Sequence, residues 1–302
     1  MTRKFFLYLS EQRRLRGWME TSPLARKLTR RFVAGETLDD ELRVAAQLQA
    51  QGVLTALDHL GENVTSLAEA QGSAAAYLSA LDQIATRGLP ATVSIKATQF
   101  GMDVSESACH ANVLRVAVRA KEIGTLVEID MESSAYIDRT LALASAVARE
   151  VGDIRVAIQA YLYRTPADID RMNQLGIRVR LVKGAYSEPP NLAHRNKADV
   201  DRSYLELMHR LFDQGIDPAI AGHDPRVIQE AIRYTRERGI APDRFEFQML
   251  YGIRRDLQRQ VLDQGFRLRL YVPYGTAWYP YFMRRLSERP ANVRFVARSL
   301  FR

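Results

Sequence analysis

Residues 271–288, with the sequence YVPYGTAWYPYFMRRLSE, combine aromatic rings with two adjacent arginines. If a helix begins near Pro280, positions three, four and seven apart share one of its faces, and that face carries Tyr281, Arg284, Arg285 and Glu288. Paired guanidinium groups bind a small carboxylate through parallel hydrogen bonds. The crowding of aromatic residues argues against a solvated basic face, which is the usual role of an arginine pair. The segment therefore predicts a site for a carboxylate ligand of amino-acid size with an apolar body.

Polar residues alternate with apolar ones in segments whose composition is typical of strands. The polar positions are Ser94, Lys96, Glu128, Asp130, Gln159, Arg180, Glu246, Gln248, Arg269 and Tyr271. In a barrel covered by helices the outer face of each strand is apolar, so this polar set is expected to point inward. We expect it to cluster at the C-terminal ends of the strands, where barrel enzymes have their active sites. Because buried charges need partners, a purely structural network of ion pairs is the alternative.

The elements that hold these residues alternate between strand and helix along the chain. Eight strands are expected at residues 53–57, 91–97, 125–131, 155–162, 178–182, 218–223, 245–250 and 267–272. Helices are expected at residues 105–123, 134–151, 195–214, 225–238 and 256–264. This order implies parallel strands, and no Pro/Gly/Ser-rich linker divides the chain. We predict an α/β protein with one (β/α)8 barrel over residues 51–302, preceded by a helical arm at residues 1–50 and completed by the extra helix near Pro280.

Composition and length exclude several classes of protein. The 302 residues are 47% hydrophobic and 26% charged, which is typical of a soluble globular chain and too apolar for a disordered one. Cys109 is the only cysteine, so no disulfide forms within the chain, and a cytoplasmic location is expected. No apolar run reaches the roughly 20 residues that span a bilayer. The net charge of +8, concentrated in residues 3–31 and 284–302, favours an anionic partner.

Several familiar chemistries have no motif in the chain. GxGxxG, Walker A and HExxH are absent, and the five histidines are scattered, so no metal site is expected. Lys96 and Lys183, at predicted strand ends, are candidates for Schiff-base chemistry as in barrel aldolases. Carboxylates such as Asp130 are available to pair with these lysines, which opposes nucleophilic attack. A flavin-free lyase stays open as an alternative, as does a basic protein that binds membrane or nucleic acid.

Motifs in order along the chain resemble those of the monofunctional bacterial proline dehydrogenases. They are LDHLGE at 57–62, SIKATQFG at 94–101, RLVKGAY at 180–186, FQMLYG at 247–252, and YVPYG with YxxRRxxE at 271–288. The resemblance runs from about residue 38 to the C-terminus. It implies a distorted (β/α)8 barrel that holds FAD without a Rossmann domain. It also implies oxidation of L-proline to Δ1-pyrroline-5-carboxylate by hydride transfer from C5 to the flavin N5, the first step of proline catabolism to glutamate.

The same resemblance implies roles for individual residues. Arg284 and Arg285 bind the substrate carboxylate, and Lys96 pairs with Glu288 and contacts the substrate. Tyr271 and Tyr281 pack against the pyrrolidine ring, and Tyr271 favours proline because related hydroxyproline enzymes have a smaller residue there. Asp130 and Arg180 are catalytic-site residues, and the positive charge of Arg180 near N5 stabilises the reduced cofactor. The residues implied to surround the flavin are Met131, Gln159, Arg180, Lys183, Gly184, Ala185, Gly222 and His223.

The resemblance further implies that electrons pass to a membrane quinone. Peripheral contact with the inner face of the cell membrane is then expected through the basic ends, where residues 294–302 mix cationic and apolar side chains. Docking of this segment on the barrel is the alternative. A pyrroline-5-carboxylate dehydrogenase is the expected consumer of the product. Nucleic acid is not an expected partner, and the oligomeric state is left open.

Overall fold

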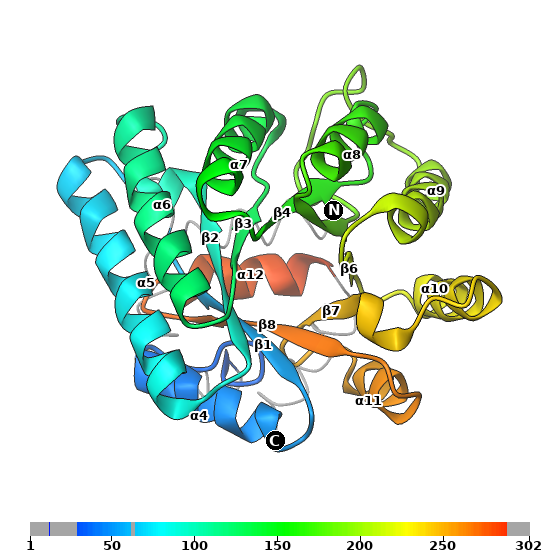
Figure 1. Ribbon diagram of the computed structural model, residues 1–302, viewed down its shortest axis with the longest axis horizontal. Coiled ribbons are helices and arrows are strands. Elements are labelled where there is room, and N and C mark those ends of the chain that lie inside the picture. The colour runs from blue at the N-terminus through cyan, green and yellow to red at the C-terminus, as the bar shows by residue number, and fades with distance from the viewer. Residues whose placement is uncertain (1–11, 13–28, 62–63, 289–302) are drawn as a thin grey trace.

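Eight parallel strands form a closed barrel whose order follows the chain, with β1 paired to both β2 and β8 (Figure 1). The computed structural model describes residues 12, 29–61 and 64–288, and for residues 284–288 it describes the backbone alone. Helices surround the strands on the outside of the barrel (Figure 1). The prediction of a (β/α)8 barrel is therefore confirmed.

Each predicted strand segment contains or overlaps one observed strand. The strands are β1 (Leu54–His59), β2 (Ala91–Lys96), β3 (Val127–Asp130), β4 (Ile154–Gln159), β5 (Arg178–Val182), β6 (Ala219–Ala221), β7 (Glu246–Leu250) and β8 (Leu268–Tyr274). The largest difference is at β4, which ends three residues before its predicted limit of 162. A turn begins there, closed by the hydrogen bond from the Leu162 N–H to the Gln159 carbonyl at 3.3 Å.

Side chains cap the start of three of the seven described helices that lie between the strands. The seven helices are α5 (Leu67–Arg87), α6 (Glu106–Glu122), α7 (Ile137–Val151), α8 (Thr165–Gln174), α9 (Lys197–Gln214), α10 (Pro225–Glu237) and α11 (Arg255–Asp263). The Ser66 side chain accepts the Glu69 N–H at the start of α5, and the Asp224 side chain accepts the Arg226 N–H at the start of α10. The five predicted helices correspond to α6, α7, α9, α10 and α11, whereas α5 and α8 were not specified.

The main hydrophobic core lies between the strands and the surrounding helices. Outward-facing strand residues such as Val93, Ile95, Val127 and Ile129 are fully buried there. Packing contacts of α5 with β2, α6 with β3 and α7 with β4 cover the outside of the strands. The barrel interior is thereby left to the polar side chains of the alternating pattern.

Two further helices flank the barrel. Helix α4 (Leu38–Gln49) begins with a capping box between Thr37 and Asp40 and packs against β1 and β8. Helix α12 (Trp278–Glu288) begins two residues before the predicted start, so that Pro280 lies in its first turn. It packs on residues that follow β1 and β7, and it lies behind the barrel in Figure 1. The division into an arm at residues 1–50 and a barrel at residues 51–302 stays a prediction.

Among the described residues, no helix is long and apolar enough to cross a bilayer. Of the basic ends at residues 3–31 and 284–302, residues 3–11, 13–28 and 289–302 lie outside the described residues, and the predicted amphipathic segment at 294–302 is among them.

Candidate active site

The ammonium of Lys96, at the C-terminal end of β2, lies between two carboxylates. Its Nζ is 3.2 Å from Asp58 Oδ1 and 3.4 Å from Asp130 Oδ2. The Tyr271 hydroxyl donates to Asp130 Oδ2 at 2.7 Å and is 3.5 Å from Lys96 Nζ. Side-chain exposure is 14% for Lys96 and 1% for Asp58, so these charges are largely removed from water. Together with Arg180, these four residues are called the upper cluster.

Arg180, on β5, is held by hydrogen bonds to two carboxylates and a hydroxyl. Its Nη1 donates to Asp130 at 2.5 Å, its Nε and Nη2 donate to Glu128 at 3.2 and 2.6 Å, and Nη2 also donates to Ser94 at 3.1 Å. The guanidinium also lies over the Tyr271 ring, 5.5 Å from its centroid. These four hydrogen bonds use four of the five guanidinium N–H groups. The fifth, on Nη1, has no acceptor among the described residues.

Burial and charge set the protonation states of the upper cluster. Burial favours a higher pKa for Asp130, but Lys96 and Arg180 outweigh burial and hold the pKa of this carboxyl below its ordinary value. Burial raises the pKa of Asp58, against the opposing effect of Lys96. Burial and the carboxylates of Asp130 and Asp58 raise the pKa of Tyr271 well above its ordinary value. At neutral pH, Asp130 is therefore ionised and Tyr271 is a neutral hydrogen-bond donor.

A second group of charged side chains lies in the barrel near the N-terminal ends of the strands. Its position shows that the prediction of a single cluster at the C-terminal ends is wrong for these residues. Glu246 accepts from Arg155 at 2.6 Å and from Arg269 at 2.8 Å, close to the N-terminal ends of β4, β7 and β8. We had expected the whole polar set at the C-terminal ends. Alternation in sequence shows which face a side chain occupies but not its height along the barrel axis. Glu128, Arg155, Glu246 and Arg269 are called the lower cluster, and for them the alternative of a structural ion-pair network is the better interpretation.

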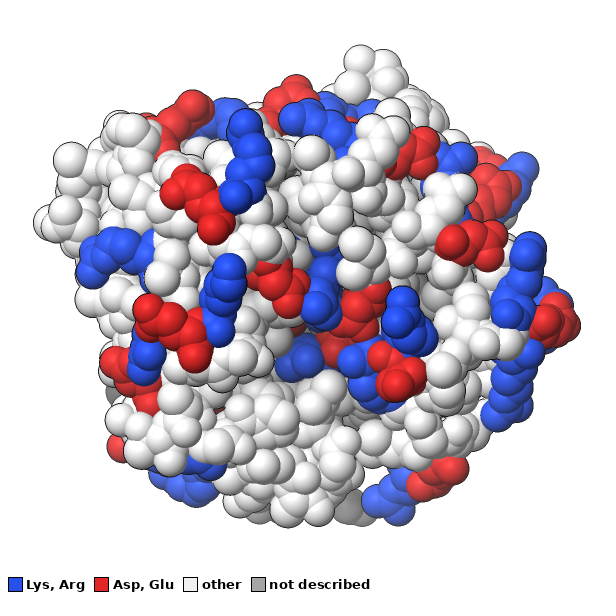
Figure 2. Space-filling view, in the orientation of Figure 1, with Lys and Arg blue, Asp and Glu red and all other residues white. Residues whose placement is uncertain are grey.

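The lower cluster continues to the N-terminal face of the barrel through Asp217. Its carboxylate pairs with Arg155 at 3.1 Å and also with Arg178 and Arg267. Asp217 has a φ of 42°, a left-handed conformation that is uncommon for residues other than glycine. Because α12 lies on the far side, Figure 2 views this N-terminal face, and charged side chains of both signs gather at its centre.

Gln159, at the end of β4, has one buried side-chain atom that no described residue contacts by a hydrogen bond. Its Nε2 donates to the Glu132 carbonyl at 3.1 Å, while Oε1 has no hydrogen-bond partner among the described residues. The side chain is 2% exposed. An unpaired buried oxygen costs free energy unless a bound group supplies a donor. Met131, 9% exposed, follows the end of β3 nearby in the fold.

Two glycines at strand ends leave room for a ligand or permit close packing. Gly184 follows β5 with a φ of +111°, and a Cβ there would lie 2.2 Å from the Tyr161 ring. Gly222 follows β6, and a Cβ there would meet no atom within 4 Å, so the space beside it is open. The adjacent His223 accepts the Leu250 N–H on Nε2 at 2.9 Å, and this bond orients its ring. Ala185 lies next to Gly184 in the same loop.

Lys183, at the end of β5, is engaged by two carboxylates as well. Its Nζ pairs with Asp201 at 2.5 Å and with Asp224 at 3.2 Å. Each of the two lysines would have to lose both of its ion pairs before its own amine could attack a carbonyl. This arrangement opposes the Schiff-base alternative.

The predicted carboxylate clamp lies on α12, of which the structure describes only the first side chains. Tyr281 is 6% exposed and belongs to a hydrophobic cluster with Trp278 and Phe282. Residues 284, 285 and 288 lie in the helix, but the side chains of Arg284, Arg285 and Glu288 are outside the described part of the structure. The predicted pairing of Lys96 with Glu288 therefore stays a prediction.

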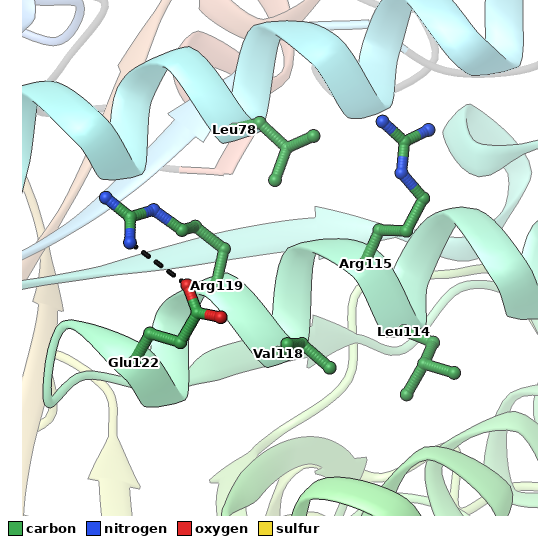
Figure 3. Close-up of a pocket in the computed structure, with 6 residues that line it drawn as sticks. All are labelled: Leu78, Leu114, Arg115, Val118, Arg119 and Glu122. Carbon is green, nitrogen blue, oxygen red and sulfur yellow. Dashed lines mark hydrogen bonds and ion pairs between the residues drawn. The ribbon is translucent and has the colours of Figure 1, made fainter.

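An open pocket of about 370 Å³ lies on the outer surface, between α5 and α6 (Figure 3). Leu78, Leu114 and Val118 provide apolar contacts, and Arg119 pairs with Glu122 at its edge at 3.0 Å. The pocket is separated from the upper cluster by the wall of the barrel, so it takes no part in that chemistry.

Sequence reasoning missed Asp58 and Arg155. Asp58 stands one residue beyond the predicted end of the first strand, so the alternation was not followed that far. Arg155 precedes Gln159 by four positions in β4, which places both on one face. The period of two, continued one residue past 57 in the first strand and back from Gln159 in the fourth, marks Asp58 and Arg155 as inward-facing.

An eight-stranded parallel barrel with a buried ionised cluster at the C-terminal ends of its strands defines a (β/α)8-barrel enzyme. The family model described as proline dehydrogenase matches residues 41–298. Proline dehydrogenase 2 of Bacillus subtilis (strain 168) is 35% identical over 99% of both chains. Proline dehydrogenase of Deinococcus radiodurans is 37% identical over 91% of this chain and 90% of that protein. The chain belongs to the proline dehydrogenase family.

A solved structure shows the same fold. Proline utilization A (PutA) from Bdellovibrio bacteriovorus, inactivated by N-propargylglycine, matches with a TM-score of 0.81 and 26% identity. The match covers 87% of this chain and 32% of that one, so this chain spans about a third of the length of that protein.

Proposed function

We propose that this protein oxidises L-proline to Δ1-pyrroline-5-carboxylate, with FAD bound at the C-terminal mouth of the barrel. In this reaction proline gives up a hydride from C5 and a proton from its nitrogen, and a C5=N double bond forms. The observation that carries the proposal is the upper cluster, in which Lys96, Asp130, Arg180 and Tyr271 meet inside the barrel. Family membership supports the same reaction.

The residues at the mouth fit a flavin. Gln159 Oε1 is a buried acceptor to which no residue in the described part of the chain donates, and the space beside Gly222 is open. Arg180 keeps one N–H without an acceptor among the described residues, on a guanidinium that Glu128 and Asp130 hold in place. Those carboxylates outweigh burial and raise the pKa of Arg180, so its charge is permanent. FAD, when bound, supplies the hydride acceptor.

The same residues divide into cofactor and substrate groups. Arg180, Gln159, Lys183 and His223 would hold the flavin with polar groups, and Met131, Gly184, Ala185 and Gly222 would surround it as well. A fixed positive charge at Arg180 stabilises negative charge that develops on reduction. On the substrate side, Arg284 and Arg285 would bind the carboxylate, Glu288 would pair with Lys96, and Tyr271 and Tyr281 would contact the ring. Tyr271 supports proline over hydroxyproline as the substrate. No residue is assigned as the base that takes the nitrogen proton.

We further propose that the electrons pass to a membrane quinone and that the protein binds peripherally at the inner face of the cell membrane. The support is the net charge of +8 and the concentration of cations at the two ends of the chain. The product would be consumed by a pyrroline-5-carboxylate dehydrogenase. Co-sedimentation with anionic vesicles, compared at low and high salt, tests the membrane contact, and no binding at low salt contradicts it.

The absorption spectrum of the purified protein tests the proposed reaction. A flavin spectrum is expected, and L-proline added without oxygen should bleach it. Arg284→Ala and Arg285→Ala should each slow the bleaching. Arg43→Ala serves as the matched control, because this arginine is 65% exposed on α4 and should have no effect.

Two outcomes contradict the proposal. Flavin that proline does not reduce would exclude proline as the substrate, although the cofactor assignment would stand. A colourless protein that cannot be reconstituted with FAD would exclude the reaction itself. It would favour the alternative of a flavin-free lyase that uses Lys96 or Lys183.

A further inference from the structure

Residues 31–35 run beside the chain that connects β8 to α12, and they are called the clasp. The Ala34 N–H donates to the Pro273 carbonyl at 2.9 Å, and the Gly275 N–H donates to the Gly35 carbonyl at 2.9 Å. The clasp is thereby joined by backbone hydrogen bonds to both sides of Tyr274, just before α12 begins. These bonds fix its position relative to the mouth of the barrel.

Two clasp side chains form part of the hydrophobic support of α12. Phe32 and Val33 are 1% and 3% exposed, and the Phe32 ring lies 5.9 Å from the Phe282 ring. They belong to a cluster that also contains Leu60, Ile253, Trp278, Tyr279, Tyr281, Phe282 and Met283. Among the described residues this cluster is separate from the main core. Helix α12 therefore depends on a small cluster, of which the clasp supplies a large ring.

The loop after β7 is shaped to accept the clasp. A Cβ at Gly252 would lie 1.7 Å from the Arg31 carbonyl oxygen, a distance that no side chain tolerates. Gly252 also has a φ of +73°, and its own carbonyl accepts from Arg31 Nε at 3.4 Å. Gly252 is the last residue of the FQMLYG motif. The close approach of the clasp explains why this position holds a residue without a side chain.

We propose that the clasp is a positioning element for the substrate site, in which Phe32 holds α12, the helix that carries residues 284 and 285, in place at the barrel mouth. This inference rests on the proposed function for the role of those two arginines. The clasp lies before residue 41, where the family-model match begins. A ligand-binding helix supported by one small cluster is competent only while that cluster is formed, and the apparent substrate affinity falls with the competent fraction.

Two substitutions break the clasp from opposite sides. Phe32→Ala removes the ring, and Gly252→Ala pushes the Arg31 backbone away. Gly52→Ala is the matched control for the second, because Gly52 has a φ of +74° and no atom within 4 Å of the added Cβ. It carries the same backbone strain without the collision. Phe32→Leu should restore most of the packing.

The expected result is a selective loss of substrate affinity. Both clasp variants should raise the KM for L-proline about tenfold, if only about a tenth of molecules keep α12 in place. The kcat and the flavin content should stay within about twofold of the unmodified protein, because the upper cluster and the flavin residues are untouched. Phe32→Leu and Gly52→Ala should leave KM nearly unchanged.

Trp278 fluorescence gives a second readout that does not depend on catalysis. Trp278 is 3% exposed, and Trp18 is the only other tryptophan, so Trp18→Phe isolates its signal. Its emission should shift to longer wavelength in Phe32→Ala and Gly252→Ala but not in Gly52→Ala. An unchanged KM in a folded Phe32→Ala variant, or a KM that rises equally in Gly52→Ala and Gly252→Ala, would overturn the proposal. If the unmodified protein fails to oxidise proline, the proposed function is wrong. If the Trp278 emission does not shift in Phe32→Ala and Gly252→Ala, the positioning role of the clasp is wrong, whatever the outcome for proline.

Discussion

Glu128 links the two clusters, and removing its charge should destabilise the barrel. Its Oε2 accepts from Arg180 Nη2 at 2.6 Å and from Gln248 at 2.9 Å, and its Oε1 accepts from Thr92 at 2.6 Å. The carboxylate is also 3.4 Å from Arg155. In Glu128→Gln the amide oxygen can still face Arg180, so the side chain keeps its shape but loses its negative charge. Asp130 is then the only one of the two carboxylates that still neutralises the charge of Arg180.

The size of the effect follows from burial. Side-chain exposure is 1% for Glu128 and 5% for Arg180, and removing one partner of a buried pair costs about 3–5 kcal/mol. At about 2 °C per kcal/mol for a chain of this size, the midpoint of thermal unfolding should fall by about 6–10 °C. Glu237→Gln is the control, because Glu237 is 58% exposed in its pair with Arg233 and should cost less than about 0.5 kcal/mol. Calorimetry at neutral pH measures both.

The pH dependence has a defined sign. Burial opposes ionisation of Glu128, but Arg180, Arg155 and Arg269 outweigh it and hold the pKa well below the ordinary value of 4.5. A depressed folded-state pKa contributes stability above the ordinary value, and this contribution is lost as the pH falls toward the folded-state pKa. Glutamine does not titrate. The loss of unfolding free energy in Glu128→Gln, relative to the unmodified protein, should therefore be largest above about pH 5 and should become smaller below it. A deficit no larger than that of Glu237→Gln, or one that widens on acidification, would refute this reasoning.

Three further predictions concern single groups. Tyr271→Phe removes the hydroxyl that donates to Asp130, so kcat/KM for proline should fall about tenfold to a hundredfold in steady-state assays; a change below threefold would contradict this. Burial raises the pKa of Cys109 to about 12, so a thiol reagent at pH 8 should find no reactive thiol in the native protein and one after unfolding. Rapid labelling of the native protein would show that the site is open. Borohydride added with Δ1-pyrroline-5-carboxylate should leave Lys96 and Lys183 unmodified in mass spectrometry, because both are held by carboxylates. A trapped adduct on either would support the lyase.

The fold was predictable because the period-two pattern and the strand–helix alternation are local properties of the chain. β5 has the bounds expected for residues 178–182, since polar and apolar residues alternate from Arg178 to Leu181. β4 was overestimated, because Ala160 and Leu162 continue an apolar pattern after the chain has turned. A strand pattern does not show where a hydrogen-bonded turn interrupts it.

The site was predictable in its residue types but not in its geometry. The family resemblance implied that Lys96, Asp130 and Arg180 belong to one site, and the structure places Asp130 within 3.4 Å of both other side chains. The division into upper and lower clusters depends on strand stagger, which no single strand encodes. Asp58 enters through pairing of β1 with β2, where it lies opposite Ser94.

The contacts of the clasp join two parts of the chain that are translated at very different times. Arg31 and Gly252 are 221 positions apart, so the clasp leaves the ribosome long before its binding surface exists. Contacts of such separation form late, because a long loop must close before they stabilise the chain. A nascent chain exposes Phe32 and Val33 until β8 and α12 are complete. The mouth of the barrel is thus assembled from segments that are translated at widely separated times, and a chain terminated before β8 lacks the backbone groups that the clasp binds.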